Sequence, residues 1–148
     1  MALTKDRNTM RAESDERRGP LLAAVAVFAG AIVMRNAAGY LTKGQTATGL
    51  VGVGVARERK TGGAGNGDET LRYWPGSFWF KNSTSTDEIT IAEVGDVCWV
   101  VDDEQVAKTS GSTTRSCAGW VEAVDANLGV LVRFDEPLLV GHIAALAS

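Results

Sequence analysis

The chain has 148 residues, of which 45 % are apolar and 22 % are charged, and its formal charge at pH 7 is −3. This composition is typical of one soluble globular domain with a buried core, and 17 glycines against 3 prolines favour a turn-rich β protein over a helical bundle. A negative net charge gives no electrostatic basis for binding DNA or RNA, so we predict no direct nucleic-acid partner.

The first 20 residues form a segment of mixed charge, with five basic and four acidic side chains. Because this segment has few apolar residues, it cannot bury enough surface to fold alone. We predict an extended N-terminal arm over residues 1–20, which either stays floppy or becomes ordered against another subunit. Its candidate interface residues are Arg7, Arg11, Arg17 and Arg18.

A secretory origin is the alternative for this end of the chain. Arg17-Arg18 before the apolar run Leu21–Met34 has the pattern of a twin-arginine or secretory signal, which would make the chain a secreted or periplasmic β-domain. The segment before the run is acidic for a signal, and the run is shorter than the roughly 20 residues that a membrane span needs. We therefore expect no membrane partner.

Residues 21–135 are predicted to form a β-barrel or sandwich body. Leu21–Phe28, Ala31–Arg35, Leu50–Val55 and Leu128–Phe134 are short apolar runs separated by turn signals. The clearest pattern is Val94–Val124, where an apolar run, an acidic cluster and a second run predict a β-hairpin. Both faces of its first strand are apolar, so we expect both to be covered. One face carries Val97, Trp99 and Val101, and the other carries Cys98 and Val100.

Two stretches share a strand–turn–strand–loop–strand plan, which indicates a weak internal repeat. The first runs from Gly30 and ends at Ala47–Val51, and the second runs from Gly95 and ends at Cys117–Val121. Each ends in a small residue, another residue, Gly, an apolar residue and Val. Two such units closing on each other predict a small barrel or sandwich with few free strand edges.

The aromatic stretch Glu69–Asn82 and the apolar end of the chain are the candidate contact regions. Alternation places Phe78 and Phe80 in the core, which leaves Trp74 and Trp79 as interface candidates. Residues 136–148 are predicted to be a short C-terminal tail, either a helix or a strand. Its candidate interface residues are Leu138, Leu139 and Ile143.

The chain has little that predicts chemistry. Its single histidine, His142, lies in the apolar tail, which does not suit a catalytic triad, and the acidic cluster Asp102–Glu104 is typical of a solvated turn. A phosphate-binding loop is followed by a helix, whereas the residues after the glycine-rich segment 61–68 have a strand pattern, so we do not expect nucleotide binding there. Cys98 and Cys117 lie in apolar strands and are predicted to be buried free thiols. We predict no enzyme activity, no cofactor and no metal.

Several short segments resemble the capsid decoration (cement, or minor capsid) proteins of Mu-like tailed bacteriophages. The resemblance extends over roughly residues 2–134. The segments that carry it are Ala2–Thr9, Ala29–Val33 before Asn36–Tyr40, Ala47–Gly54, Phe80–Ser83, and Val100–Asp103 before Val106–Thr109.

This resemblance implies a virion structural protein. Such a protein is made in the bacterial cytoplasm and binds the outer surface of the phage head, commonly as a homotrimer, where it stabilises contacts between major capsid protein subunits. The implied fold is a small β-barrel or β-tulip-like sandwich with an extended arm. The alternative from the residues alone is a carbohydrate- or host-surface-binding β module, in which Tyr73, Trp74 and Trp79 form a stacking platform.

Overall fold

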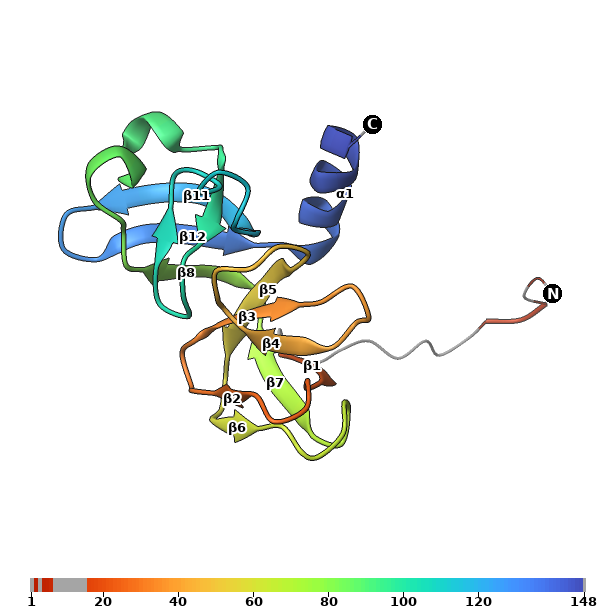
Figure 1. Cartoon of the computed structure of the whole chain (residues 1–148). Coiled ribbons are helices and arrows are strands. Elements are labelled where there is room, and N and C mark those ends of the chain that lie inside the picture. The colour runs from red at the N-terminus through yellow and green to blue at the C-terminus, as the bar shows by residue number, and fades with distance from the viewer. Residues whose placement is uncertain (1, 3, 7–15, 148) are drawn as a thin grey trace.

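The computed structural model describes residues 2, 4–6 and 16–147, which fold mainly into antiparallel β-structure with one C-terminal helix (Figure 1). The expectation of an all-β protein is therefore confirmed. The strands are β1 Arg17–Pro20, β2 Ala26–Val27, β3 Ile32–Arg35, β4 Leu41–Lys43, β5 Val51–Ala56, β6 Lys60–Thr61, β7 Thr70–Trp74, β8 Gly76–Phe80, β9 Val97–Val100, β10 Val106–Ala107, β11 Cys117–Asp125 and β12 Gly129–Phe134. The helices are the 3-10 turns η1 Ser85–Asp87 and η2 Ile91–Glu93, and the α-helix α1 Glu136–Ala147.

The strands form two five-stranded sheets and one short ribbon. The order in the first sheet is β1-β7-β5-β3-β4, the order in the second is β10-β9-β11-β12-β8, and β2 pairs with β6 in the ribbon. None of the sheets closes into a barrel, so the arrangement is a sandwich and the closed barrel that we considered is wrong.

The chain crosses from one sheet to the other between β7 and β8. Pro75 cannot donate a backbone hydrogen bond, and Gly76 takes a positive φ of +121° that disfavours other residues. The extended chain therefore bends at Pro75-Gly76 and continues along β12 of the second sheet, where Gly76 pairs with Phe134.

The first sheet is buried on both of its faces at β3. Ile32 and Met34 belong to the core shared with the second sheet, while Val33 on the opposite face belongs to a separate core under the ribbon. Strands with two covered faces are apolar at consecutive positions, which explains the run Ile32-Val33-Met34.

Three sequence expectations differ from the structure. β9 was expected to be covered on both faces, but only Cys98 and Val100 are fully buried, and Trp99 is partly exposed. Most of the predicted strand Leu21–Phe28 is irregular, because its backbone turns to pair with a loop and only β2 is regular. Residues 17–20 of the predicted arm form β1, an edge strand of the first sheet.

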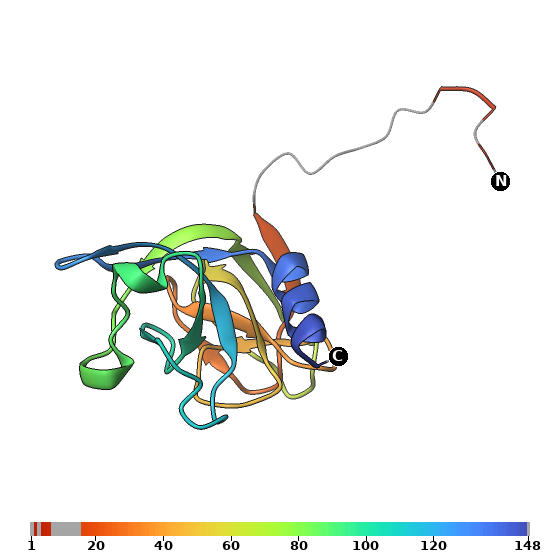
Figure 2. The same cartoon turned by 90° about the horizontal axis from the view of Figure 1, so that it is seen from above.

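The C-terminal tail is a helix, one of the two structures that the sequence left open. α1 packs on β5 and β11, at the end of the sandwich opposite the turn of the β11–β12 hairpin (Figure 2). No helix in the described part of the chain is long and apolar enough to cross a membrane.

Candidate functional site

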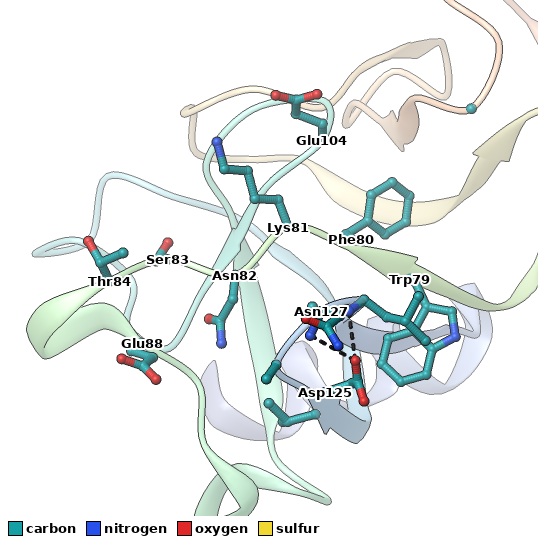
Figure 3. A pocket seen from close by; sticks show the side chains of 15 residues that line it. Trp79, Phe80, Lys81, Asn82, Ser83, Thr84, Glu88, Glu104, Asp125 and Asn127 are labelled. Atoms are coloured by element: carbon teal, nitrogen blue, oxygen red, sulfur yellow. Dashed lines mark hydrogen bonds between the residues drawn. The ribbon is translucent and has the colours of Figure 1, made fainter.

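A large concave surface is an open groove of about 780 Å³ between the segment that follows β8 and the β11–β12 hairpin (Figure 3). We call it the hairpin groove. Trp79 is 38 % exposed at one side of it, whereas its neighbour Phe80 points inward and packs edge-on against Phe134, with ring centroids 5.9 Å apart. The alternation of β8 therefore presents one aromatic ring to the groove and one to the core, as predicted for these two residues.

The hairpin wall of the groove is fixed by Asp125. Its Oδ2 atom accepts the backbone N–H groups of Asn127 and Leu128, both at 2.8 Å. These hydrogen bonds lower the pKa of Asp125 below its usual value, so the group is an anion. Leu128, at the tip of this turn, is 58 % exposed beside it. The carboxylate thus serves as a turn cap and as negative charge.

The groove combines an apolar surface with a negative balance of charge. Glu88, Glu104 and Asp125 line it against one cation, Lys81, a sum of −2. Carboxylates around an exposed indole suit a polar or basic extended ligand. Among the described residues, no group of three or more His, Cys, Asp or Glu side chains is placed to hold a metal ion.

A second candidate surface is the outer side of α1. Leu138, Val140 and Leu146 are 52 %, 47 % and 69 % exposed, whereas Leu139 is completely buried against the body. Leu139 was predicted to be an interface residue, but its own chain already covers it. Ile143 is half-buried and, with Leu146, lines an apolar groove of about 580 Å³ beside Trp99 and Cys117.

An arginine holds the start of α1 on the first sheet. Arg35 Nε and Nη2 donate to the two carboxylate oxygens of Glu136 at 2.7 and 3.2 Å, Nη2 also donates to the Tyr73 hydroxyl at 3.1 Å, and Nη1 donates to the Gly39 carbonyl at 3.0 Å. Burial alone would lower the pKa of Arg35, but Glu136 and Tyr73 together raise it above its usual value. The forked contact with Glu136 fixes where the exposed side of the helix points.

The predicted arm residues are only partly described. Arg7 and Arg11 lie outside the described residues, while Arg17 and Arg18 are exposed on β1.

Burial raises the pKa of Tyr73, which lies in the core and accepts the Arg35 hydrogen bond. Because Tyr73 is buried, the predicted three-aromatic stacking platform is not formed.

Trp74 and His142 each contact a side chain of the same chain, and the two cysteines are buried. The guanidinium of Arg57 lies 5.5 Å from the centre of the exposed Trp74 ring, and His142 packs edge-on against Trp120 at 6.1 Å. Cys98 and Cys117 are buried free thiols on the neighbouring strands β9 and β11, as predicted. Burial raises the pKa of Cys98 to about 12 and that of Cys117 to about 11.

Ile91 is one of several exposed apolar side chains that the sequence does not predict. Ile91, 81 % exposed, opens η2, which begins with a capping box between Thr90 and Glu93. The sequence Thr-x-x-Glu is a known signal for such a start, so the turn could have been predicted, although the exposure of Ile91 could not.

Comparisons with protein-family models, curated proteins and solved structures give no match.

Proposed function

We propose that the chain is a decoration protein of a tailed-phage head, which binds the outer surface of the head and stabilises contacts between major capsid subunits. The observation that carries this proposal is the outer side of α1. This helix of 12 residues has one charged side chain, Glu136, which is already paired with Arg35, and three large apolar side chains that face solvent.

A helix that is apolar around most of its circumference is normally buried, and exposed apolar surface of this kind marks a contact with another protein. The Arg35–Glu136 contact and the buried Leu139 hold α1 in a fixed position. A fixed apolar helix needs little further ordering on binding. Weak contacts of this kind, repeated over every copy on a shell, add up to stable attachment through avidity.

The sequence resemblance supports the same function. It extends over roughly residues 2–134, a range that contains the strands of both five-stranded sheets. A homotrimer on the head surface, a location on the virion and a β-tulip-like relation between the sheets are parts of the proposal that come from this resemblance.

The proposal is tested by adding purified chain to phage heads that lack a decoration protein and measuring co-sedimentation. We expect saturable binding, and a cryo-electron reconstruction that places the chain on the outer surface. Leu138→Asp with Val140→Asp should reduce binding by at least tenfold, because a charge in an apolar contact costs more than about 1.4 kcal/mol.

The control is Thr86→Asp, a substitution at an exposed position in η1 away from α1, which should bind like the unchanged chain. No binding of the unchanged chain to any head surface would refute the proposal. Equal binding by the α1 variant would show that α1 is not the contact.

A further inference from the structure

The two five-stranded sheets have the same construction. In each sheet, the strand that comes first in the chain lies at one edge and pairs with the strand that comes last in the chain. The orders across the sheets are β1-β7-β5-β3-β4 and β8-β12-β11-β9-β10. In each, the chain just after or at the end of this edge strand forms a parallel bridge to the opposite edge, Leu21 to Leu41 and Lys81 to Gln105. Five strands with one order, one set of directions and one edge bridge indicate two copies of a single unit.

Residue-level features repeat at a constant offset of 65 positions. The register between β3 and β5 shifts at Val53, and the register between β9 and β11 shifts at Ala118. Gly30 donates to the Ala56 carbonyl at 2.9 Å, and Gly95 donates to the Val121 carbonyl at 2.9 Å, each with a positive φ. The two units are therefore equivalent in backbone geometry around their central strands.

The units differ in the segment that follows the edge strand. In the first unit, residues 22–27 lie along the loop between β5 and β7 and hydrogen-bond to it. Ala24 donates to the Gly63 carbonyl at 3.0 Å, Gly62 donates to the Val25 carbonyl at 2.8 Å, and β2 pairs with β6. The approach is close, because a Cβ atom on Gly62 would lie 2.1 Å from the Leu22 carbonyl oxygen.

In the second unit, the corresponding segment turns away from the corresponding hairpin. Asp87 accepts hydrogen bonds from Lys108 N–H at 3.0 Å and from Thr109 Oγ1 at 2.5 Å, and it pairs with Arg115 at 3.2 Å. These contacts hold residues 84–88 beside the loop after β10. The hairpin groove is the space that opens between this segment and the β11–β12 hairpin. At the equivalent position the first unit has the β2–β6 pairing. In the second unit, residues 84–88 do not pair with the β11–β12 hairpin, and the groove lies between them.

We propose that the hairpin groove binds an extended polypeptide, and that its occupant is the N-terminal segment, residues 2–12, of a second copy of the chain. The groove lining sums to −2, and residues 2–12 carry Lys5, Arg7 and Arg11 against Asp6, a sum of +2. An extended segment can pair with an exposed backbone edge, and its basic side chains can reach the surrounding carboxylates. Leu3 and Met10 of the segment can contact the exposed Trp79 and Leu128.

The position of the groove favours a second copy over the chain's own N-terminus. Figures 1 and 2 both place the β11–β12 hairpin at one end of the molecule and β1, which the N-terminal segment precedes, toward the other. Donor and acceptor at different ends give a head-to-tail contact between copies. The inference concerns the isolated chain, so it goes beyond the proposed function and does not depend on binding to a phage head.

The test joins donor and acceptor positions by a disulfide. Chains carrying Lys5→Cys are mixed with chains carrying Asn127→Cys under mild oxidation, and the linked dimer is quantified. Cys98 and Cys117 do not interfere, since both are buried. We expect the linked dimer to form about tenfold faster than with Lys43→Cys as acceptor, an exposed control position on the first sheet.

Charge reversal in the groove gives an independent measurement. Glu88→Lys with Glu104→Lys, added to the Asn127→Cys acceptor, should reduce its rate of linkage to that of the control position. Glu69→Lys with Asp96→Lys, exposed carboxylates outside the groove, should leave the rate unchanged. Circular dichroism of each variant verifies folding.

Two results would overturn the inference. One is an equal rate for the Asn127→Cys and Lys43→Cys acceptors, which would show that the segment has no preference for the groove. The other is a chain carrying both Lys5→Cys and Asn127→Cys that closes its own disulfide at a rate unaffected by excess unsubstituted chain, which would assign the groove to the chain's own N-terminus.

Discussion

At the scale of single residues, Arg35 is a polar residue that joins several parts of the molecule. Its guanidinium contacts β7 through Tyr73, the β3–β4 turn through Gly39 and α1 through Glu136. Arg35→Lys keeps the charge but cannot form the fork, so we expect the free energy of unfolding in urea to fall by about 1–3 kcal/mol.

The matched control for Arg35→Lys is Arg133→Lys. Arg133 contacts Asp135 at 3.4 Å on an exposed surface, so this change should alter the free energy of unfolding by less than about 0.5 kcal/mol. Similar losses for the two variants would show that the Arg35 contacts add nothing beyond a surface ion pair.

The buried thiol of Cys98 makes stability depend on pH in the alkaline range. Burial raises its pKa from 9.0 to about 12, so above pH 9 the folded chain retains a proton that the unfolded chain releases. The free energy of unfolding should therefore fall between pH 9 and 11, by up to about 1.4 kcal/mol per pH unit from this group.

Urea denaturation at about pH 8, 9, 10 and 11 measures this dependence. Because lysines and tyrosines also titrate in that range, the comparison is with Cys98→Ala, which should show a shallower decrease over the same interval. Parallel curves for the two chains would mean that the thiol does not stay protonated in the folded state.

At the scale of elements, Gly54 on β5 and Gly119 on β11 are equivalent positions in the two units. A Cβ atom added at Gly54 would lie 2.2 Å from the Trp74 carbonyl oxygen, and one added at Gly119 would lie 2.1 Å from the Arg133 carbonyl oxygen. Both neighbours are backbone atoms of a paired strand and cannot move away alone. We expect Gly54→Ala and Gly119→Ala each to lower the free energy of unfolding by about 3 kcal/mol or more.

Gly141→Ala is the control for these two substitutions. Nothing lies within 4 Å of a Cβ atom added at Gly141, which is inside α1, so alanine should stabilise the chain by up to about 1 kcal/mol through helix propensity. Urea midpoints of the three variants check both the sign and the similarity of the two sheets. Tolerance of alanine at only one of Gly54 and Gly119 would contradict their equivalence.

The sequence predicts the positions of the strands better than it predicts which strand residues of the two units are equivalent. The repeat was visible because turns at Asn36–Gly39 and Asp102–Gln105 interrupt apolar runs in the same way, and these positions do connect β3 to β4 and β9 to β10. The end of the repeat was aligned incorrectly, with Ala47–Val51 opposite Cys117–Val121. In the structure Gly52–Gly54 is opposite Cys117–Gly119, because the correspondence depends on a bulge that composition does not show.

The candidate surfaces were predictable to different degrees. The outward position of Trp79 follows from strand alternation, and that of Leu138 follows from its place in a short apolar tail, although its contact with a partner stays a prediction. The hairpin groove was not foreseen, since it depends on where the segment after β8 turns, and that turn is set by contacts of Asp87 with Thr109 and Arg115, far away in the sequence. The position of the C-terminal helix also involves a long-range contact, Arg35 to Glu136, that the sequence does not show.

At the scale of the whole molecule, the two units have diverged in what they present. In the first unit, the segment after the edge strand pairs with the loop between β5 and β7, and this unit carries the N-terminal donor, whereas the second unit keeps an open groove. A head-to-tail contact between donor and acceptor forms a closed ring when its rotation closes and a filament when it does not. A ring with α1 exposed on every subunit would present several copies of the same apolar helix to a lattice of identical partners, which is the condition for avidity.

This division of roles predicts different outcomes for two N-terminal deletions. A variant lacking residues 2–15 keeps β1 and the ion pairs of Glu16 with Arg57 and Arg72. It should unfold in urea within about 0.5 kcal/mol of the full chain, since it keeps every strand found in the described residues. By light scattering it should be monomeric at concentrations where the full chain associates.

A variant lacking residues 2–20 also loses β1, which pairs with β7 over four residues. Each backbone hydrogen bond lost there should cost about 0.5–1.5 kcal/mol, and the uncovered edge of β7 should promote aggregation. The shorter deletion thus separates association from folding, whereas the longer one combines them. If the variant lacking residues 2–15 associates as the full chain does, the N-terminal segment is not the donor, and copies of the chain must meet through another surface.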